Sequence, residues 1–205
     1  MGAGVTLRSV GVSVDGDRRR FLRDLDRLAA AVVQPMGDTT RTAPRTHDAT
    51  RGELTWRVRV EPEDPTFPAM FRLTWGVRVP GLLERRWPPG SADAKALRPD
   101  YAGTLFSEDV EQIRSGRSRV YKYRVGNKPG LLGRLNPLAP DQVMHLSEMT
   151  TYLTTLVEET LTPQMTTVRT RSDLADWMER NQTLCGYARL DTWLRDVTLI
   201  LRDSV

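Results

Sequence analysis

The residues best suited to acid–base chemistry in this chain are two histidines, and one of them has an acidic residue close by. His145 and Glu148 are three residues apart near the start of an expected helix, so they share a face and can interact. A metal site would need a further ligand, and the sequence has no HExxH or Glu-x-x-His repeat to supply it. We therefore expect no metal, and an enzyme centred on His145 and Glu148 is the third function that we consider.

The cysteine content and the loop motifs give no stronger indication of catalysis. The single cysteine, Cys185, excludes an intramolecular disulfide, and no histidine is placed beside it by the sequence. We expect a small, partly buried structural thiol there. Neither GxxxxGK[ST] nor GxGxxG occurs, which disfavours a nucleotide-dependent enzyme. The sequence therefore predicts no catalytic residues and no cofactor.

One stretch combines positive charge with aromatic residues. Between Ile113 and Pro140 there are seven basic residues and no acidic residue. Further arginines lie on the polar face of an expected hairpin, and a basic sheet face flanked by aromatics can hold single-stranded nucleic acid. The candidate residues for binding an anion or nucleic acid are Arg57, Arg59, Arg72, Arg119, Tyr121, Lys122 and Arg124.

The hairpin arginines allow two interpretations. If Val60 lies opposite Ala69, then Arg57 faces Arg72, and such like-charge pairs are tolerated best beside a carboxylate of the chain or a bound phosphate. In the second interpretation, the acidic residues of the expected helix over 141–161 neutralise the strands within the same fold. The sheet face is then solvated and internally compensated.

The strands that position these arginines are the clearest elements of the sequence. Residues 54–60 and 71–79, within Leu54–Leu82, alternate between apolar and polar side chains. Period-two alternation is typical of a sheet with one buried face and one solvent-facing face. We therefore expect a half-buried antiparallel hairpin with Trp56 and Trp75 on its inner face.

The remaining segments predict a single α+β domain over residues 1–205. Asp15, Asp141 and Ser172 are expected helix caps, and Pro163 is expected to end the long helix. The expected elements are helices over 15–33, 107–115, 141–161, 172–178 and 187–201, strands over Val5–Val14 and Val120–Val125, and mobile loops over 37–52 and 84–101. This order predicts an antiparallel sheet with helices packed on one face and a helical C-terminal third.

Three short motifs resemble a family of small uncharacterised bacterial α+β domains, a domain of unknown function. They are the helix end Val33-Gln34-Pro35-Met36-Gly37, the strand Phe71–Val77 followed by Pro80, and Pro163 followed by Thr170–Leu174. The resemblance covers about residues 15–180. It implies the α+β fold and brings no activity, cofactor or catalytic residue.

Composition and the remaining aromatics complete the functional prediction. Arginine makes up 27 of the 30 basic residues, a bias typical of a GC-rich bacterial genome, so the net charge of +4 is weak evidence for an acidic ligand. No run approaches the roughly 20 apolar residues of a membrane span, so we expect a soluble cytoplasmic protein.

Trp87, beside Pro88 in a long loop, is a candidate interface anchor. The leading prediction is a non-enzymatic interaction protein, regulatory, immunity-type or an assembly component, that binds a protein partner. The alternative is a nucleic-acid-binding or phosphate-binding protein.

Overall fold

A seven-stranded sheet forms one layer of the molecule, in the order β1-β2-β3-β4-β6-β7, with β5 also paired to β4. The computed structural model describes residues 14–64, 67–79, 82, 104–105, 108–123, 143–181 and 191–203. The strands are β1 Thr40–Ala43, β2 Thr46–Arg51, β3 Leu54–Asp64, β4 Phe67–Arg78, β5 Glu108–Asp109, β6 Tyr121–Tyr123 and β7 Val143–Met144. All pairs are antiparallel except β6 with β7.

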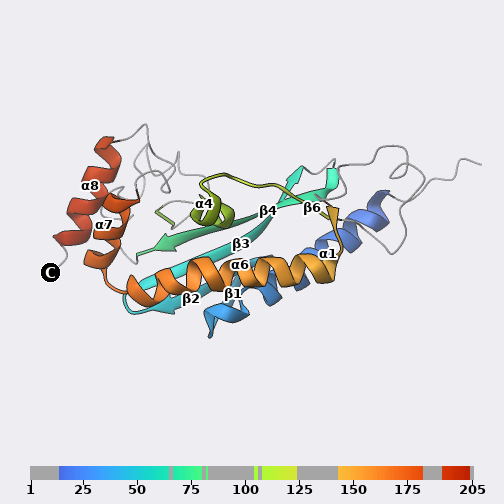
Figure 1. Cartoon of the computed structure of the whole chain (residues 1–205), viewed down its shortest axis with the longest axis horizontal. Helices are drawn as coiled ribbons and strands as arrows, with labels where there is room; N and C mark the ends of the chain where they lie inside the picture. The colour runs from blue at the N-terminus through green and yellow to red at the C-terminus, as the bar shows by residue number, and fades with distance from the viewer. Residues whose placement is uncertain are drawn as a thin grey trace, which may run out of the picture.

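Helices cover one face of this sheet. They are α1 Val14–Val32, the 3₁₀ helix η1 Gln34–Met36, α4 Val110–Ser115, α6 Leu146–Thr167, α7 Arg171–Arg180 and α8 Asp191–Arg202. In Figure 1, α6 runs lengthwise along the sheet beside α1, and α7 and α8 lie together at one end. The predicted α+β class, with helices on one face and a helical C-terminal third, is confirmed.

The alternating hairpin supplies the centre of the core, as predicted. Trp56 and Trp75 are 1% and 2% exposed, and their rings stack with centroids 5.6 Å apart. Trp177 of α7 meets Trp75 edge-on, with ring centroids 5.5 Å apart. Offset-stacked and edge-to-face contacts are the favoured geometries of aromatic pairs, so three tryptophans join the sheet to α7.

The register of this hairpin differs from the one considered in the sequence analysis. Val60 faces Leu73, not Ala69, and Arg72 therefore faces Glu61 while Arg57 faces Gly76. The strands extend further toward the turn than that register allowed, because β3 continues to Asp64. The result replaces a like-charge pair with an attractive one.

The expected mobile loop over 37–52 contains the strands β1 and β2. Thr46, His47, Asp48 and Ala49 are all buried in β2. These residues lack an apolar alternation, so the pattern indicated a loop. Antiparallel pairing of β2 with β3 satisfies their backbone, and an ion pair described below satisfies Asp48. The other expected loop, 84–101, lies outside the described residues.

The long helix also differs from the prediction. It starts at Leu146 and continues through Pro163 to Thr167, because Met165, 3% exposed, still packs into the core beyond the proline. The proline removes one helical hydrogen bond and does not end the helix. The expected cap Asp141 lies outside the described residues.

Two further helix starts are corrected by the structure. Thr170, not Ser172, caps α7, since its hydroxyl accepts from the N–H of Asp173 at 3.1 Å and its N–H donates to the Asp173 carboxylate at 2.9 Å. Asp15 lies inside α1, and so does Val14, the last residue of the expected strand Val5–Val14. Residues 5–13 lie outside the described part of the chain. None of the helices in the described segments is long and apolar enough to span a bilayer.

Candidate functional site

Arg57, the first of the predicted anion-binding residues, is paired with a carboxylate of its own sheet. Its Nε and Nη2 donate to the two oxygens of Asp48 at 2.7 and 2.8 Å. The Nη1 of Arg78 lies 3.4 Å from the same carboxylate. The side chains of Arg57 and Asp48 are only 13% and 8% exposed, so this bidentate pair is largely removed from solvent.

Arg59 and Arg72 are also neutralised within the sheet layer. Arg59 lies 3.0 Å from Glu61. The closest oxygen to Arg72 belongs to Glu63 at 2.5 Å, and Asp109 of β5 follows at 3.6 Å. The acidic partners therefore come from the strands, not from the long helix as expected. The polar face of the hairpin is internally compensated, which is the second interpretation of the sequence.

Tyr121 lies in the core and not on an open surface. Its side chain is 3% exposed and its ring lies 5.5 Å from that of Phe71. Its hydroxyl donates to Glu111 at 3.3 Å, and burial raises the pKa of this phenol strongly. A base cannot stack on the ring in this arrangement. The neighbouring Lys122 is half-buried in β6, between Met70 of β4 and Val143 of β7.

Arg119 belongs to a polar cluster that links α4, β6 and α6. The carboxylate of Glu111, a buried residue, accepts from Arg114 at 2.7 Å and from the hydroxyl of Tyr152 at 3.0 Å. Arg119 donates to the same hydroxyl at 2.9 Å, and Arg114 also donates to it. The guanidinium of Arg119 lies 5.5 and 5.4 Å from the ring centroids of Tyr121 and Tyr152, within cation–π range.

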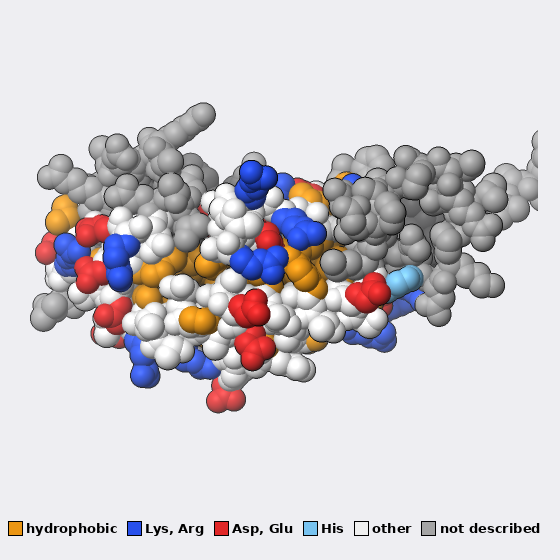
Figure 2. All heavy atoms as spheres, in the orientation of Figure 1, with side chains coloured by type: hydrophobic (Ala, Val, Ile, Leu, Met, Phe, Trp, Pro, Cys, Tyr) orange, Lys and Arg blue, Asp and Glu red, His pale blue; other side chains and the backbone are white. Residues whose placement is uncertain are grey.

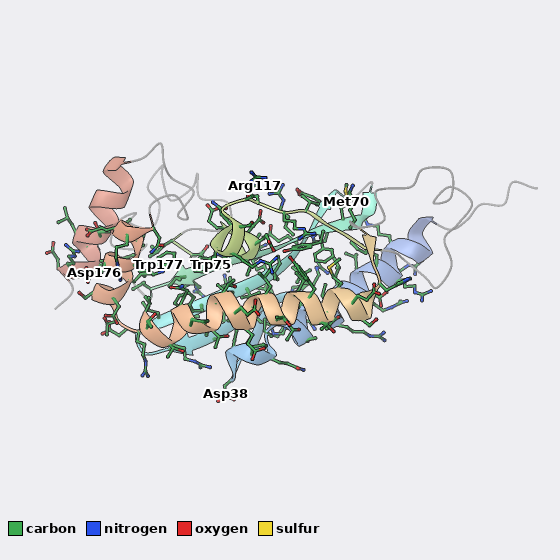
Figure 3. All side chains as sticks on the ribbon, in the orientation of Figure 1. Asp38, Met70, Trp75, Arg117, Asp176 and Trp177 are labelled. Atoms are coloured by element: carbon green, nitrogen blue, oxygen red, sulfur yellow. The ribbon has the colours of Figure 1, made fainter. Side chains whose placement is uncertain are left out.

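We call Arg114, Arg117, Arg119 and Tyr152 the arginine corner. Of its three arginines, only Arg114 has a carboxylate of the described residues within ion-pair distance, that of Glu111 at 2.7 Å. Basic side chains gather above α6 on the face shown in Figure 2, and Arg117 projects outward from the end of α4 in Figure 3. The corner therefore carries surplus positive charge next to a half-exposed tyrosine.

Sequence reasoning found only part of this corner. It named Arg119, and Arg114 and Arg117 are among the seven basic residues of the stretch without acids. It missed Tyr152, which α6 brings to the corner from a distant part of the chain. No spacing in the sequence signals that contact, because it depends on how α6 packs against α4.

Two acidic residues of β5 are held in unusual surroundings. Asp109 is 4% exposed, and burial raises its pKa against the lowering effects of a Ser118 hydrogen bond and Arg72. Burial, and then the neighbouring Asp109, raise the pKa of Glu108 to about 7. Glu108 lies opposite Trp75 in the strand pairing, which explains its desolvation. Neither acid has a histidine among its charged neighbours.

We expect Glu108→Gln to stabilise the protein at pH 8 and to have little effect at pH 4. The folded state raises the pKa of Glu108 from its ordinary 4.5 to about 7, so it favours the protonated form. The stability that protonated Glu108 contributes is fully present below pH 4.5, and it is lost as the pH rises through 7. The gain at pH 8, reduced for partial exposure, is about 1–2 kcal/mol.

Urea unfolding at pH 4, 6 and 8 would measure this difference, with the exposed residue Glu158 changed to Gln as the control. A gain at pH 8 no larger than that of Glu158→Gln would contradict the desolvation of Glu108.

The remaining predicted residues do not form a reactive cluster in the described structure. His145 is exposed at the N-cap of α6, and its backbone N–H donates to the Glu148 carboxylate at 3.1 Å. The expected interaction between these two residues is thus a helix cap. The parts of the chain that the structure describes contain no group of three potential metal ligands. Trp87, Arg124 and Cys185 lie outside the described residues.

The comparisons with known proteins identify no relative. No family model, curated protein or solved structure matches this chain. The resemblance to uncharacterised bacterial α+β domains therefore stays a prediction, and the geometry alone supports any functional assignment.

Proposed function

We propose that this chain is a non-enzymatic interaction protein whose arginine corner binds an acidic surface of a partner protein. The observation that carries the proposal is the charge balance of the corner. Of its three guanidinium groups, only that of Arg114 has a carboxylate partner among the described residues, while the predicted arginines of the sheet have carboxylates of their own.

The corner is also rigid enough to favour binding. Arg114 and Arg119 are both fixed on Tyr152, with guanidinium-to-ring distances of 5.1 and 5.4 Å. An arginine that is already ordered loses less side-chain entropy when it binds. Arginine and tyrosine are enriched among the residues that dominate interface energies. Trp87 remains a second predicted anchor of the same kind.

Nucleic-acid binding is the second candidate, because the stretch from Ile113 to Pro140 is basic and lacks acids. A protein that binds single strands combines a long basic groove with stacking aromatics. Arg57 and Arg72 are ion-paired, and the ring of Tyr121 is buried. A compact positive corner suits an acidic protein surface better than a phosphate chain.

We expect Arg117→Glu to reduce capture of the partner from the native host by about tenfold, since it reverses a charge at the centre of the interface. Arg117 is exposed and makes no ion pair within the described residues, so the change leaves the fold intact. Arg23→Glu on α1 is the matched control, because Arg23 is also exposed and lies on a different element. Quantitative mass spectrometry of the captured proteins is the measurement.

The same experiment separates the two candidates when it is repeated after nuclease treatment. Capture that depends on Arg117 and survives nuclease supports the protein partner. Loss of all such capture with nuclease would establish nucleic-acid binding instead. Equal capture by Arg117→Glu and Arg23→Glu would contradict binding of the partner by the arginine corner.

A further inference from the structure

A cleft with a volume of about 320 Å³ lies between η1, the end of β2 and the last turns of α6. It lies at the other end of α6 from the arginine corner, since Tyr152 and Thr166 are about 21 Å apart along the helix. Small-molecule sites usually start at about 300 Å³. The residues lining it include Pro35, Met36, Arg51, Thr162, Met165 and Arg169.

Arg51 forms one charged wall of the cleft. Its guanidinium donates to the carbonyl oxygens of Thr50, at 2.8 Å, and Met36. Gly37 allows this approach, because a Cβ there would lie 2.6 Å from Nη2 of Arg51. A guanidinium has five N–H donors, so these two bonds fix its position and leave donors for a ligand.

Arg169 forms the other charged wall, and the docking of the β2–β3 turn holds it there. The N–H of Glu53 donates to the Arg169 carbonyl at 2.9 Å, and the N–H of Arg171 donates to the Glu53 carboxylate at 2.9 Å. Gly52 has φ +59°, and a Cβ on it would lie 2.3 Å from the Arg169 oxygen. Two segments far apart in the sequence are thereby locked together with their arginines beside one cleft.

No carboxylate in the described residues lies within ion-pair distance of Arg51 or Arg169. Asp38 is close in sequence, but it projects away from the body of the molecule in Figure 3. The hydroxyls of Thr162 and Thr166 donate to carbonyls of their own helix, so the two guanidinium groups are the side-chain donors that the lining offers to a ligand.

The rest of the lining is apolar. Met36 and Met165 are 2% and 3% exposed and pack behind the cleft, and Pro35 completes this wall. A ligand that fits both the two arginines and the apolar wall of the cleft has an anionic head and an apolar body. At about 30 Å³ for each non-hydrogen atom, the volume a water molecule takes in the liquid, the cleft holds about ten such atoms.

We infer that this cleft binds a small organic anion, a carboxylate or phosphate monoester with a short apolar chain, through Arg51 and Arg169. Guanidinium groups match both anions because they donate parallel hydrogen bonds to two oxygens. The apolar chain then lies along the wall that Met36, Met165 and Pro35 form. The site is independent of the arginine corner and of its partner.

Titration with octanoate, which has ten non-hydrogen atoms, tests this site in the full chain. With ¹³C-methyl-labelled methionine, we expect saturable NMR shifts at Met36 and Met165. Met149, about 24 Å from Met165 along α6, is the internal control and stays unchanged. Hexyl phosphate, in a second titration, shows whether a phosphate head is accepted as well as a carboxylate. Octanol, which lacks the charge, should bind at least tenfold more weakly.

Arg169→Gln is the decisive variant, because the Arg169 side chain is exposed and its structural bond uses only the backbone carbonyl. Losing one charge-assisted contact should weaken octanoate binding by about tenfold or more. Arg23→Gln, at an exposed site on α1 outside the cleft, should leave the affinity unchanged. Unshifted cleft methionines, equal binding of octanol, or an Arg169→Gln affinity equal to that of Arg23→Gln would each overturn the assignment.

Discussion

Replacing Trp75 with alanine is expected to lower the free energy of unfolding by about 3–5 kcal/mol, one of the two largest effects considered for this chain. The side chain is 2% exposed, stacks on Trp56 and meets Trp177 edge-on. The substitution therefore removes buried apolar area and two ring contacts, and it leaves a cavity where the sheet meets α7. Urea unfolding followed by circular dichroism measures the loss without relying on tryptophan fluorescence.

Leu199→Ala on α8 is the control for this prediction. Leu199 is 50% exposed, so its truncation should change the free energy of unfolding by no more than about 0.5 kcal/mol. If Trp75→Ala and Leu199→Ala had equal effects, the tryptophan cluster would not be the centre of the core.

Asp48→Ala is expected to lower the free energy of unfolding by a similar amount, about 3–5 kcal/mol, for an electrostatic reason. Asp48 forms a bidentate ion pair with Arg57, whose side chain is 13% exposed, and Arg78 lies near the same carboxylate. Without Asp48, the Arg57 guanidinium stays largely desolvated and loses this bidentate carboxylate partner. The same urea unfolding measurement applies.

The double variant Asp48→Ala with Arg57→Met distinguishes this cause from a simple loss of packing. Replacing both partners of a buried ion pair is often close to neutral, so much of the lost stability should return. Asp38→Ala, at an exposed site, should have little effect. A double variant less stable than Asp48→Ala would show that the lost ion pair with Asp48 is not the cause.

The central hairpin could be predicted because its signal is local. Alternation along 54–60 and 71–79 depends only on neighbouring residues, and it correctly placed Trp56 and Trp75 inside. Its register could not be predicted in the same way. It depends on where the chain turns, and the continuation of β3 to Asp64 moved Arg72 opposite Glu61.

The strand β2 shows why buried polar segments escape pattern recognition. Thr46–Ala49 is largely polar, and its burial depends on pairing with β3 and on the bond between Asp48 and Arg57. These are contacts between different elements, and only the folded chain reveals them. The same reason applies to α6, which passes Pro163 because Met165 reaches the core.

In both candidate binding sites, the sequence indicates some of the residues, and only tertiary packing brings the others to the site. The acid-free stretch pointed to Arg119, but Tyr152 joins it only through the packing of α6. Arg51 and Arg169 become neighbours of one cleft only after Gly52 and Glu53 dock on the segment before α7. Composition identifies such residues as charged, and tertiary structure decides which of them remain uncompensated.

The most direct test of the proposed function is photocrosslinking from position 155 in the native host. Thr155 is exposed on α6 and follows Tyr152 by three residues, so it lies on the same face as the arginine corner. A photoreactive residue there should form an adduct that protease destroys and nuclease leaves intact, whereas the same residue at position 23 should form none. A nuclease-sensitive adduct at position 155, or equal adducts from both positions, would contradict a protein partner at this corner.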